Sequence, residues 1–191
     1  MAARTSTDLW VGTISADPHV LLLTVTDIEI RPSRYGAPMA RSLVQAAVAD
    51  LVNRYGGAGD DTPVDALEFD PPEGCFLVAL LDGEPVGCGG WRVLGGASDP
   101  ERSDGPEPGK DVAEIKRMYT SPSARGRGVA SALLQALEDS ARAAGMRRMV
   151  LETGGRNPEA IAFYATVGYE RIENYGFYKD EPDCVSFGRD L

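Results

Sequence analysis

A six-residue segment at residues 125–130, RGRGVA, has the residue types of a phosphate-binding turn. Gly126 and Gly128 allow tight turning and close approach of a ligand to the backbone. The apolar periodicity that follows predicts a helix whose free N–H groups and positive dipole end face this turn. Such a junction binds phosphate, and the side chains of Arg125 and Arg127 add cationic donors. The segment therefore predicts a site for a phosphorylated ligand.

Two better-known phosphate motifs do not fit this segment. A Walker loop requires GKS or GKT, and neither follows the glycines. A dinucleotide-binding turn requires the spacing GxGxxG after the first strand of the chain, and here both the spacing and the place differ. The ligand must be held by another arrangement of backbone groups.

A second set of polar residues lies about thirty residues further on. Asn157, Ala160 and Tyr164 fall on one face of a predicted helix, which would point two polar groups toward a common site. The alternative for Tyr164 is a core aromatic residue whose hydroxyl is satisfied by the backbone.

The elements that must position these residues follow from periodicity and turn signals. Helices are predicted at residues 39–55, 128–144 and 158–167, with a short helix around 64–69. Strands are predicted at residues 22–31, 75–81, 85–94, 112–120, 148–153, 169–174 and 184–189. Residues 95–110 have the composition of a solvated loop, and residues 1–19 read as an N-terminal extension. The order β-α-β-β-β-α-β-α-β-β predicts a single α/β domain over residues 20–191, with helices packed on a mixed, mostly antiparallel central sheet.

At these two motifs the chain resembles the GCN5-related N-acetyltransferase (GNAT) family. Arg125, Gly128 and Ala130 match the family pattern Q/R-x-x-G-x-G/A, and the residues from Asn157 to Tyr169 match N-x-x-A-x-x-x-Y-x-x-x-G-F/Y. The resemblance covers roughly residues 22–191 and is strongest over 112–170. It implies an acyl-CoA N-acyltransferase fold and acetyl-coenzyme A as cosubstrate.

The resemblance also implies which residues bind the coenzyme. The backbone amides of Arg125, Gly126, Arg127, Gly128, Val129 and Ala130 would hold the pyrophosphate. Backbone groups of Met118, Tyr119 and Thr120 would pair with the pantetheine arm, and Asn157 would contact the coenzyme further along.

Acetyl transfer to an amine requires a neutral amine, a stabilised oxyanion and a protonated leaving thiolate. Tyr164 is the expected general acid, because a phenol with a pKa of about 10 can protonate a thiolate whose acid has a pKa of about 8.5. Glu114 is the expected base, since a carboxylate on a central strand must face solvent or a polar cleft. Strand alternation would place Glu114, Lys116 and Met118 on one face. The alternative for Glu114 is a salt bridge or solvation at the sheet edge.

Composition limits the other functions. The formal net charge of -10 argues against nucleic acid as a partner and against a toxin acting on aminoacyl-tRNA. Three cysteines without CxxC spacing and one histidine, His19, argue against a disulfide framework and a metal site. We see no signal peptide or membrane span, which leads us to expect a cytoplasmic protein.

The resemblance implies that the acceptor side of the cleft is bounded by the segment after the first helix and by the last strand pair. Here these regions are residues 59–74 and 173–183, and both are acidic. They suggest a cationic amine: a small polyamine-like or amino-sugar compound, or a lysine side chain. The alternative is that these loops only solvate the surface. A non-catalytic coenzyme A-binding sensor of the same fold is the second functional hypothesis. Because the family often forms dimers through the last strands, the resemblance leaves a homodimer open.

Overall fold

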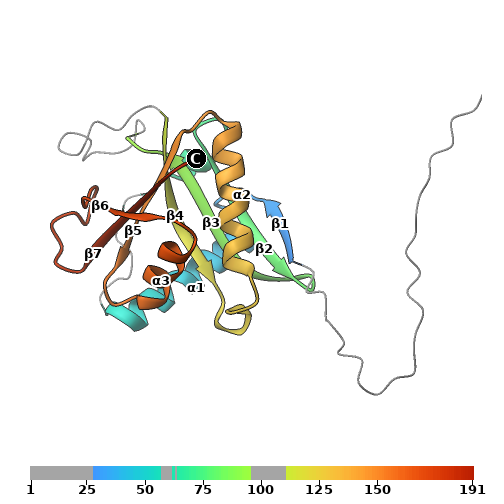
Figure 1. The fold of residues 1–191 in the computed structure, drawn as a ribbon. Coiled ribbons are helices and arrows are strands. Elements are labelled where there is room, and N and C mark those ends of the chain that lie inside the picture. Colours follow the sequence, from blue (N-terminus) through green and yellow to red (C-terminus); the bar gives the residue numbers. More distant parts are fainter. Residues whose placement is uncertain (1–27, 57–61, 63, 96–110) are drawn as a thin grey trace, which may run out of the picture.

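A computed structural model describes residues 28–56, 62, 64–95 and 111–191 of the chain. In this part of the chain one seven-stranded sheet has the order β1-β2-β3-β4-β5-β7-β6. Its strands pair antiparallel except for β4 and β5, which are parallel. The predicted mixed, mostly antiparallel sheet in a single domain is confirmed (Figure 1).

The described elements follow the predicted order. The strands are β1 (Ile28–Pro32), β2 (Gly74–Leu81), β3 (Glu84–Val93), β4 (Val112–Thr120), β5 (Arg148–Gly154), β6 (Glu170–Ile172) and β7 (Cys184–Asp190). The helices are α1 (Pro38–Tyr55), α2 (Val129–Ala143) and α3 (Pro158–Thr166), with 3-10 turns η1 (Ala66–Phe69) and η2 (Pro122–Ala124). The expected extension at 1–19, the first residues of the expected strand at 22–31 and the expected loop beyond residue 95 lie outside the described residues.

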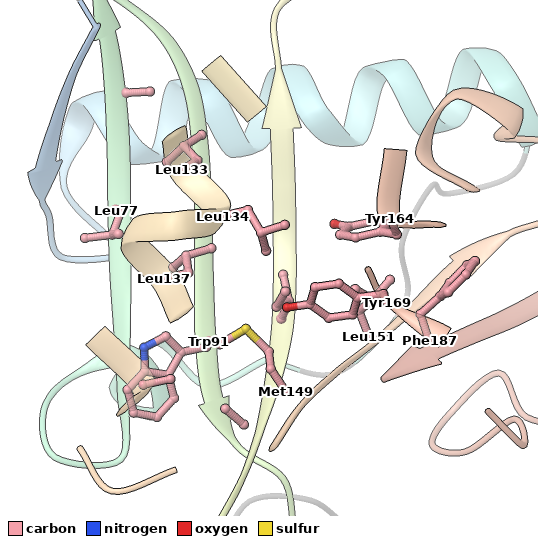
Figure 2. Close-up of a cluster of buried hydrophobic side chains, with 14 of the residues drawn as sticks. Leu77, Trp91, Leu133, Leu134, Leu137, Met149, Leu151, Tyr164, Tyr169 and Phe187 are labelled. Atoms are coloured by element: carbon pink, nitrogen blue, oxygen red, sulfur yellow. The ribbon is translucent and has the colours of Figure 1, made fainter. Parts of the chain in front are cut away.

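Helices cover both faces of the sheet. Leucines of α2, with aromatic residues from α3 and β7, pack on one face together with Trp91 and Met149 (Figure 2). On the opposite face Ala40 and Leu43 of α1 pack against a separate cluster that contains Phe76. Alternate residues of β2 serve the two clusters, as the period of a strand requires.

The two parallel strands diverge soon after they begin. β4 and β5 pair over three positions, which end at Glu114 opposite Val150. Beyond this point β4 continues to Thr120 and β5 to Gly154 without pairing to each other. The divergence leaves backbone N–H and C=O groups along the facing edges without a partner strand, and such groups need other hydrogen-bond partners.

An extra residue in β4 interrupts its pairing with β3. The register shifts between Cys88 and Gly90, so Gly89 lies opposite two residues, Arg117 and Met118. Arg117 has a φ of 57°, in the left-handed region that residues other than glycine rarely adopt. This is a β-bulge, a feature that locally redirects side chains.

The bulge reverses the alternation of β4. Met118 packs against the core under α2, whereas Tyr119 packs against the cluster under α1. Strict alternation from Glu114 predicts the opposite face for both residues. That prediction is wrong, because the bulge adds one residue to the strand between Lys116 and Tyr119.

Candidate active site

A cavity of about 780 Å³ opens where β4 and β5 diverge. Its lining comes from α1, β4, the turn into α2, β5, α3 and the segment before β7. The volume lies in the range of pockets that bury a small ligand. The divergence of the strands therefore brings together both motifs that the sequence singles out.

The turn at residues 124–131 presents free backbone donors to this cavity. Gly126 and Gly128 have φ values of 74° and 87°, which favour glycine. The N–H of Ala132 donates to the carbonyl of Gly128 at 3.0 Å, and this is the first hydrogen bond of α2. The N–H groups of residues 129–131 precede it and have no acceptor within the helix. An anion placed here would meet these donors and the positive end of the helix dipole.

The two arginines of the turn point to different places. Arg125 lines the cavity, and its guanidinium lies 3.2 Å from Oδ2 of Asp50. Arg127 is not among the described residues that line the cavity, and it pairs with Asp82 of the β2–β3 turn at 3.1 Å. The expectation that both side chains add donors to the site is therefore corrected for Arg127, whose guanidinium is held by a surface ion pair.

Met118, Tyr119 and Thr120 line the cavity. They lie on the part of β4 beyond its pairing with β5, so the strand edge that faces β5 is open there. Backbone groups on an open strand edge can pair with an extended ligand in the manner of an added strand.

Asn157 lines the cavity and also caps α3. Its Oδ1 accepts a hydrogen bond from the N–H of Ala160 at 3.4 Å, which fixes the side chain at the start of the helix. The amide Nδ2 of Asn157 is a separate donor.

Tyr164 combines a buried ring with a hydroxyl at the cavity. The residue is 5% exposed, and its ring lies 5.6 Å from that of Tyr169 and 6.1 Å from that of Phe187, centroid to centroid. The hydroxyl takes part in no hydrogen bond among the residues that the structure describes, and in Figure 2 it points toward β4. Burial raises the pKa of this phenol well above its usual value. The ring is thus a core aromatic, while the hydroxyl is not satisfied by the backbone.

Glu114 lies inside the protein and is not among the described lining residues. It is 2% exposed, with Lys116 Nζ at 2.8 Å and Arg92 Nε at 2.9 Å from its two oxygens. Burial alone would raise the pKa of Glu114, but the two cations outweigh burial and hold it below the usual value. This geometry matches the salt-bridge alternative and argues against Glu114 as the base.

Glu152 on β5 is a carboxylate that the sequence analysis missed. It lines the cavity, its side chain is 6% exposed, and its Oε2 lies 3.3 Å from Lys116 Nζ. Burial raises the pKa of Glu152, and its partial pairing with Lys116 does not reverse this. The signal was available: a carboxylate in an apolar strand, by the argument applied to Glu114, must face a polar space.

The two acidic segments contribute unequally to the cavity. From residues 173–183, the side chains of Tyr178, Glu181 and Asp183 line it. From residues 59–74, only Thr62 lines it among the residues that the structure describes, and residues 59–61 and 63 lie outside them. Glu68 of the same segment turns inward and pairs with Arg92 at 2.7 Å.

Arginines also line the cavity and tie its walls together. Nη1 of Arg54 in α1 donates to the carbonyl of Arg156 and to Glu159, both at 3.0 Å. The guanidinium of Arg156 pairs with Asp183 at 2.9 Å and lies 4.7 Å from the ring centre of Tyr55. These contacts join the end of α1 to the turn between β5 and α3.

The three cysteines of the chain are free thiols, and burial raises the pKa of Cys88 to about 12. Within the described ranges, no group of three or more His, Cys, Asp or Glu residues could hold a metal ion. No helix in those ranges is long and apolar enough to span a membrane.

Comparisons with known proteins agree with this arrangement. The sequence model of a family described as "Acetyltransferase (GNAT) family" matches residues 42–169. An "IAA acetyltransferase" of Azospirillum brasilense is 34% identical over 148 residues, which cover 74% of this chain and 88% of that protein. An "Uncharacterized N-acetyltransferase YjgM" of Escherichia coli is 33% identical over 105 residues, 55% of this chain and 56% of that protein.

Solved structures show the same fold. A putative acyl-CoA N-acyltransferase from Klebsiella pneumoniae superposes with a TM-score of 0.65 and 25% identity, covering 86% of this chain and 97% of that one. The GNAT domain of S. lividans PAT superposes with a TM-score of 0.62 and 25% identity, covering 85% and 89% of the two chains.

Proposed function

Because the chain belongs to the GNAT family of acetyltransferases, we propose that it transfers the acetyl group of acetyl-coenzyme A to a primary amine bound between β4 and β5. The observation that carries the proposal is the divergence of these strands. One cavity there is lined by an open strand edge, a helix start with free N–H groups and the hydroxyl-bearing end of Tyr164.

The coenzyme would bind through backbone groups. The free N–H groups at the start of α2 suit a pyrophosphate, with the guanidinium of Arg125 at the same wall. The open edge of β4 at residues 118–120 suits the amide-bearing pantetheine arm. Asn157 can donate from Nδ2 while its Oδ1 remains engaged in capping α3.

Two side chains would carry the proton transfers. An alkyl ammonium has a pKa of about 10.4, so the acceptor must lose a proton before it attacks the thioester. Glu152, directly or through a water, is the proposed base in place of Glu114, because it lines the cavity and burial raises its pKa. Tyr164 is the proposed acid for the leaving thiolate, because its phenol lines the cavity and is protonated near pH 7. A backbone N–H near Met118 would stabilise the oxyanion.

The proposed acceptor is a cationic amine: a small polyamine-like or amino-sugar compound, or a lysine side chain. Glu152 and Glu181 line the cavity and favour a positively charged molecule. Three arginines of the lining are paired with acidic groups, Arg54 with Glu159, Arg125 with Asp50 and Arg156 with Asp183, which reduces their repulsion of a cation.

The test is a free-thiol assay with acetyl-coenzyme A and a panel of amines of different charge. Wild type should release thiol with cationic amines. Tyr164→Phe and Glu152→Gln should each lower kcat by about 10²- to 10⁴-fold, the usual contribution of a general acid or base. Both variants should bind coenzyme A with unchanged affinity in calorimetry. Tyr169→Phe, which removes a phenol hydroxyl outside the described cavity lining, is the matched control.

Different failures have different meanings. Turnover with neutral or anionic amines alone would contradict the acceptor class and leave the reaction intact. Saturable coenzyme A binding without turnover on any amine would favour the non-catalytic sensor. No saturable coenzyme A binding would contradict the proposed function as a whole.

A further inference from the structure

Five buried charged side chains form a continuous ion-pair network from η1 to the cavity. Their order is Glu68, Arg92, Glu114, Lys116 and Glu152. Successive nitrogen–oxygen distances are 2.7, 2.9, 2.8 and 3.3 Å, and each side chain is at most 10% exposed. Such a network is costly to bury unless its charges alternate in sign, as they do here.

The network contains three carboxylates and two cations, so a single negative charge is left over when all five groups are ionised. Glu68 does not bear the deficit, because Arg92 lies at 2.7 Å and the N–H of Asp65 donates to the same carboxylate at 3.2 Å. Lys116 is shared between two carboxylates and lies closer to Glu114 than to Glu152. The uncompensated charge therefore falls at the cavity end.

No other charged group among the described residues compensates Glu152. Lys116 and Glu114 of β4 are the charged residues that face it. From the segment before β7, Tyr175 lies beside both carboxylates and a backbone N–H of Tyr178 donates to Glu152. From β7, the thiol of Cys184 lies 3.9 Å from Oε1 of Glu152. All three of these groups are neutral near pH 7.

We propose that Lys116 and Glu114 are positioning residues for acetyl transfer. Lys116 holds the Glu152 carboxylate at the cavity wall, and competition from Glu114 for the same ammonium keeps Glu152 basic enough to take a proton from the acceptor. The inference rests on the proposed function of Glu152 as the base. The pKa directions agree with it, since that of Glu114 lies below the usual value and that of Glu152 above it.

The two partners should act on Glu152 in opposite directions. Lys116→Met removes the ammonium, so the pKa of Glu152 should rise and the acid limb of kcat/KM should move to higher pH. Glu114→Gln removes the competing carboxylate, so the pKa of Glu152 should fall and the limb should move to lower pH. A purely structural role would lower activity at every pH without moving the limb.

The experiment combines pH profiles of kcat/KM with titration of the Glu152 carboxyl by NMR of protein carrying ¹³C-labelled glutamate. The Glu152→Gln spectrum assigns the signal. We expect shifts of about one pH unit or more, upward in Lys116→Met and downward in Glu114→Gln. Arg147→Met removes the same positive charge as Lys116→Met, but from a side chain that is 83% exposed. It should change neither the pH profile nor the titration of Glu152. If Lys116→Met does not fold, the test rests on the titration of Glu152 in Glu114→Gln and in Lys116→Arg, which preserves the charge.

Two results would overturn the inference: equal titration of Glu152 in wild type and in the foldable variants, or a Glu114→Gln shift to higher pH. The NMR titration needs no acceptor, so it gives this answer even if the proposed function fails. If the carboxyl shifts as expected while Glu152→Gln retains full activity, the network is right. Glu152 is then not the base, and the catalytic part of the inference falls with it.

Discussion

The phenol oxygen of Tyr169 lies 3.1 Å from Oε1 of Glu138, a carboxylate of α2 that is 2% exposed. The same carboxylate receives Arg142 at 3.2 Å and Arg189 of β7 at 3.3 Å. The backbone N–H of Tyr169 donates to the carbonyl of Tyr164 at 2.9 Å. Tyr169 thus joins α2, which follows the turn at residues 125–130, to α3, which carries the proposed acid Tyr164.

Removing the phenol hydroxyl of Tyr169 should destabilise the protein without changing its affinity for coenzyme A. Tyr169→Phe takes a donor from a buried carboxylate and should lower the free energy of unfolding by about 1–3 kcal/mol. Urea denaturation measures it. Thr166→Val removes an exposed hydroxyl of α3, which donates to the carbonyl of Ala162 at 2.8 Å, and should change stability by about 0.5 kcal/mol or less. An equal loss in both variants would show that the Glu138 contact contributes nothing specific.

The backbone conformation at Gly128 should matter for ligand binding as well as for stability. Gly128 and Gly145 have nearly the same φ, 87° and 88°, at the two ends of α2. An added Cβ meets nothing within 4 Å at Gly145 and only the Cδ1 of Ile28, at 3.7 Å, at Gly128. Gly128→Ala and Gly145→Ala should therefore cost similar stability, about 1–2 kcal/mol of left-handed strain each.

Calorimetry with coenzyme A separates the two glycine variants. Gly128→Ala should weaken binding about tenfold or more, because relaxing its strain turns the N–H groups of the turn away from the ligand. Gly145→Ala should bind like wild type. Equal affinities would mean that the turn does not hold the coenzyme.

Asn157 has two roles that two substitutions can divide. Asn157→Asp keeps the oxygen that caps α3 and should leave Tm close to that of wild type, but it replaces the Nδ2 donor with negative charge and should weaken coenzyme A binding. Asn157→Ala loses the cap as well, at a cost of about 0.5–2 kcal/mol. Thermal melting and calorimetry on the same samples measure both effects. Unchanged affinity in Asn157→Asp would exclude a contact through Nδ2.

The fold was predictable because local signals agree along the chain. Period-two apolar runs, the Asp82–Gly83 turn and the glycines after each helix fix the order of elements, which the structure confirms. The bulge at Arg117 left no such signal. The sequence VAEIKRMYT reads as an uninterrupted strand, and a positive φ at arginine is set by the surrounding packing rather than by local propensity.

The candidate site was predictable where motifs are local, and not where partners are distant. The turn at residues 125–130 and the helix face of Asn157 and Tyr164 are each contained in one short segment. Glu114 lies where β4 and β5 still pair, whereas Glu152 lies beyond the point at which they diverge, and Arg92 from another strand pairs with Glu114. Two carboxylates on neighbouring strands look alike in sequence, and only the three-dimensional arrangement distinguishes them.

These two carboxylates should have opposite effects on stability at pH 7. The pKa of Glu114 is lowered in the folded state, so its contribution is present above the unfolded value of about 4.3 and is lost as pH falls through the lower folded pKa. The pKa of Glu152 is raised, so its ionised form costs stability above its folded pKa, and that cost is relieved as pH falls toward the unfolded value.

Thermal melting of the two glutamine variants across pH tests this contrast. At pH 7 Glu114→Gln should lose roughly 3–5 kcal/mol, because it breaks a buried network, and the loss should shrink below about pH 4 as the wild-type carboxylate is protonated. Glu152→Gln should raise Tm by about 2–4 °C, the shift that about 1 kcal/mol gives in a chain of this size, and the gain should vanish in acid. A lower Tm in Glu152→Gln at pH 7 would show that Lys116 compensates both carboxylates. The enzyme would then sacrifice no stability to keep a charge at the cavity wall.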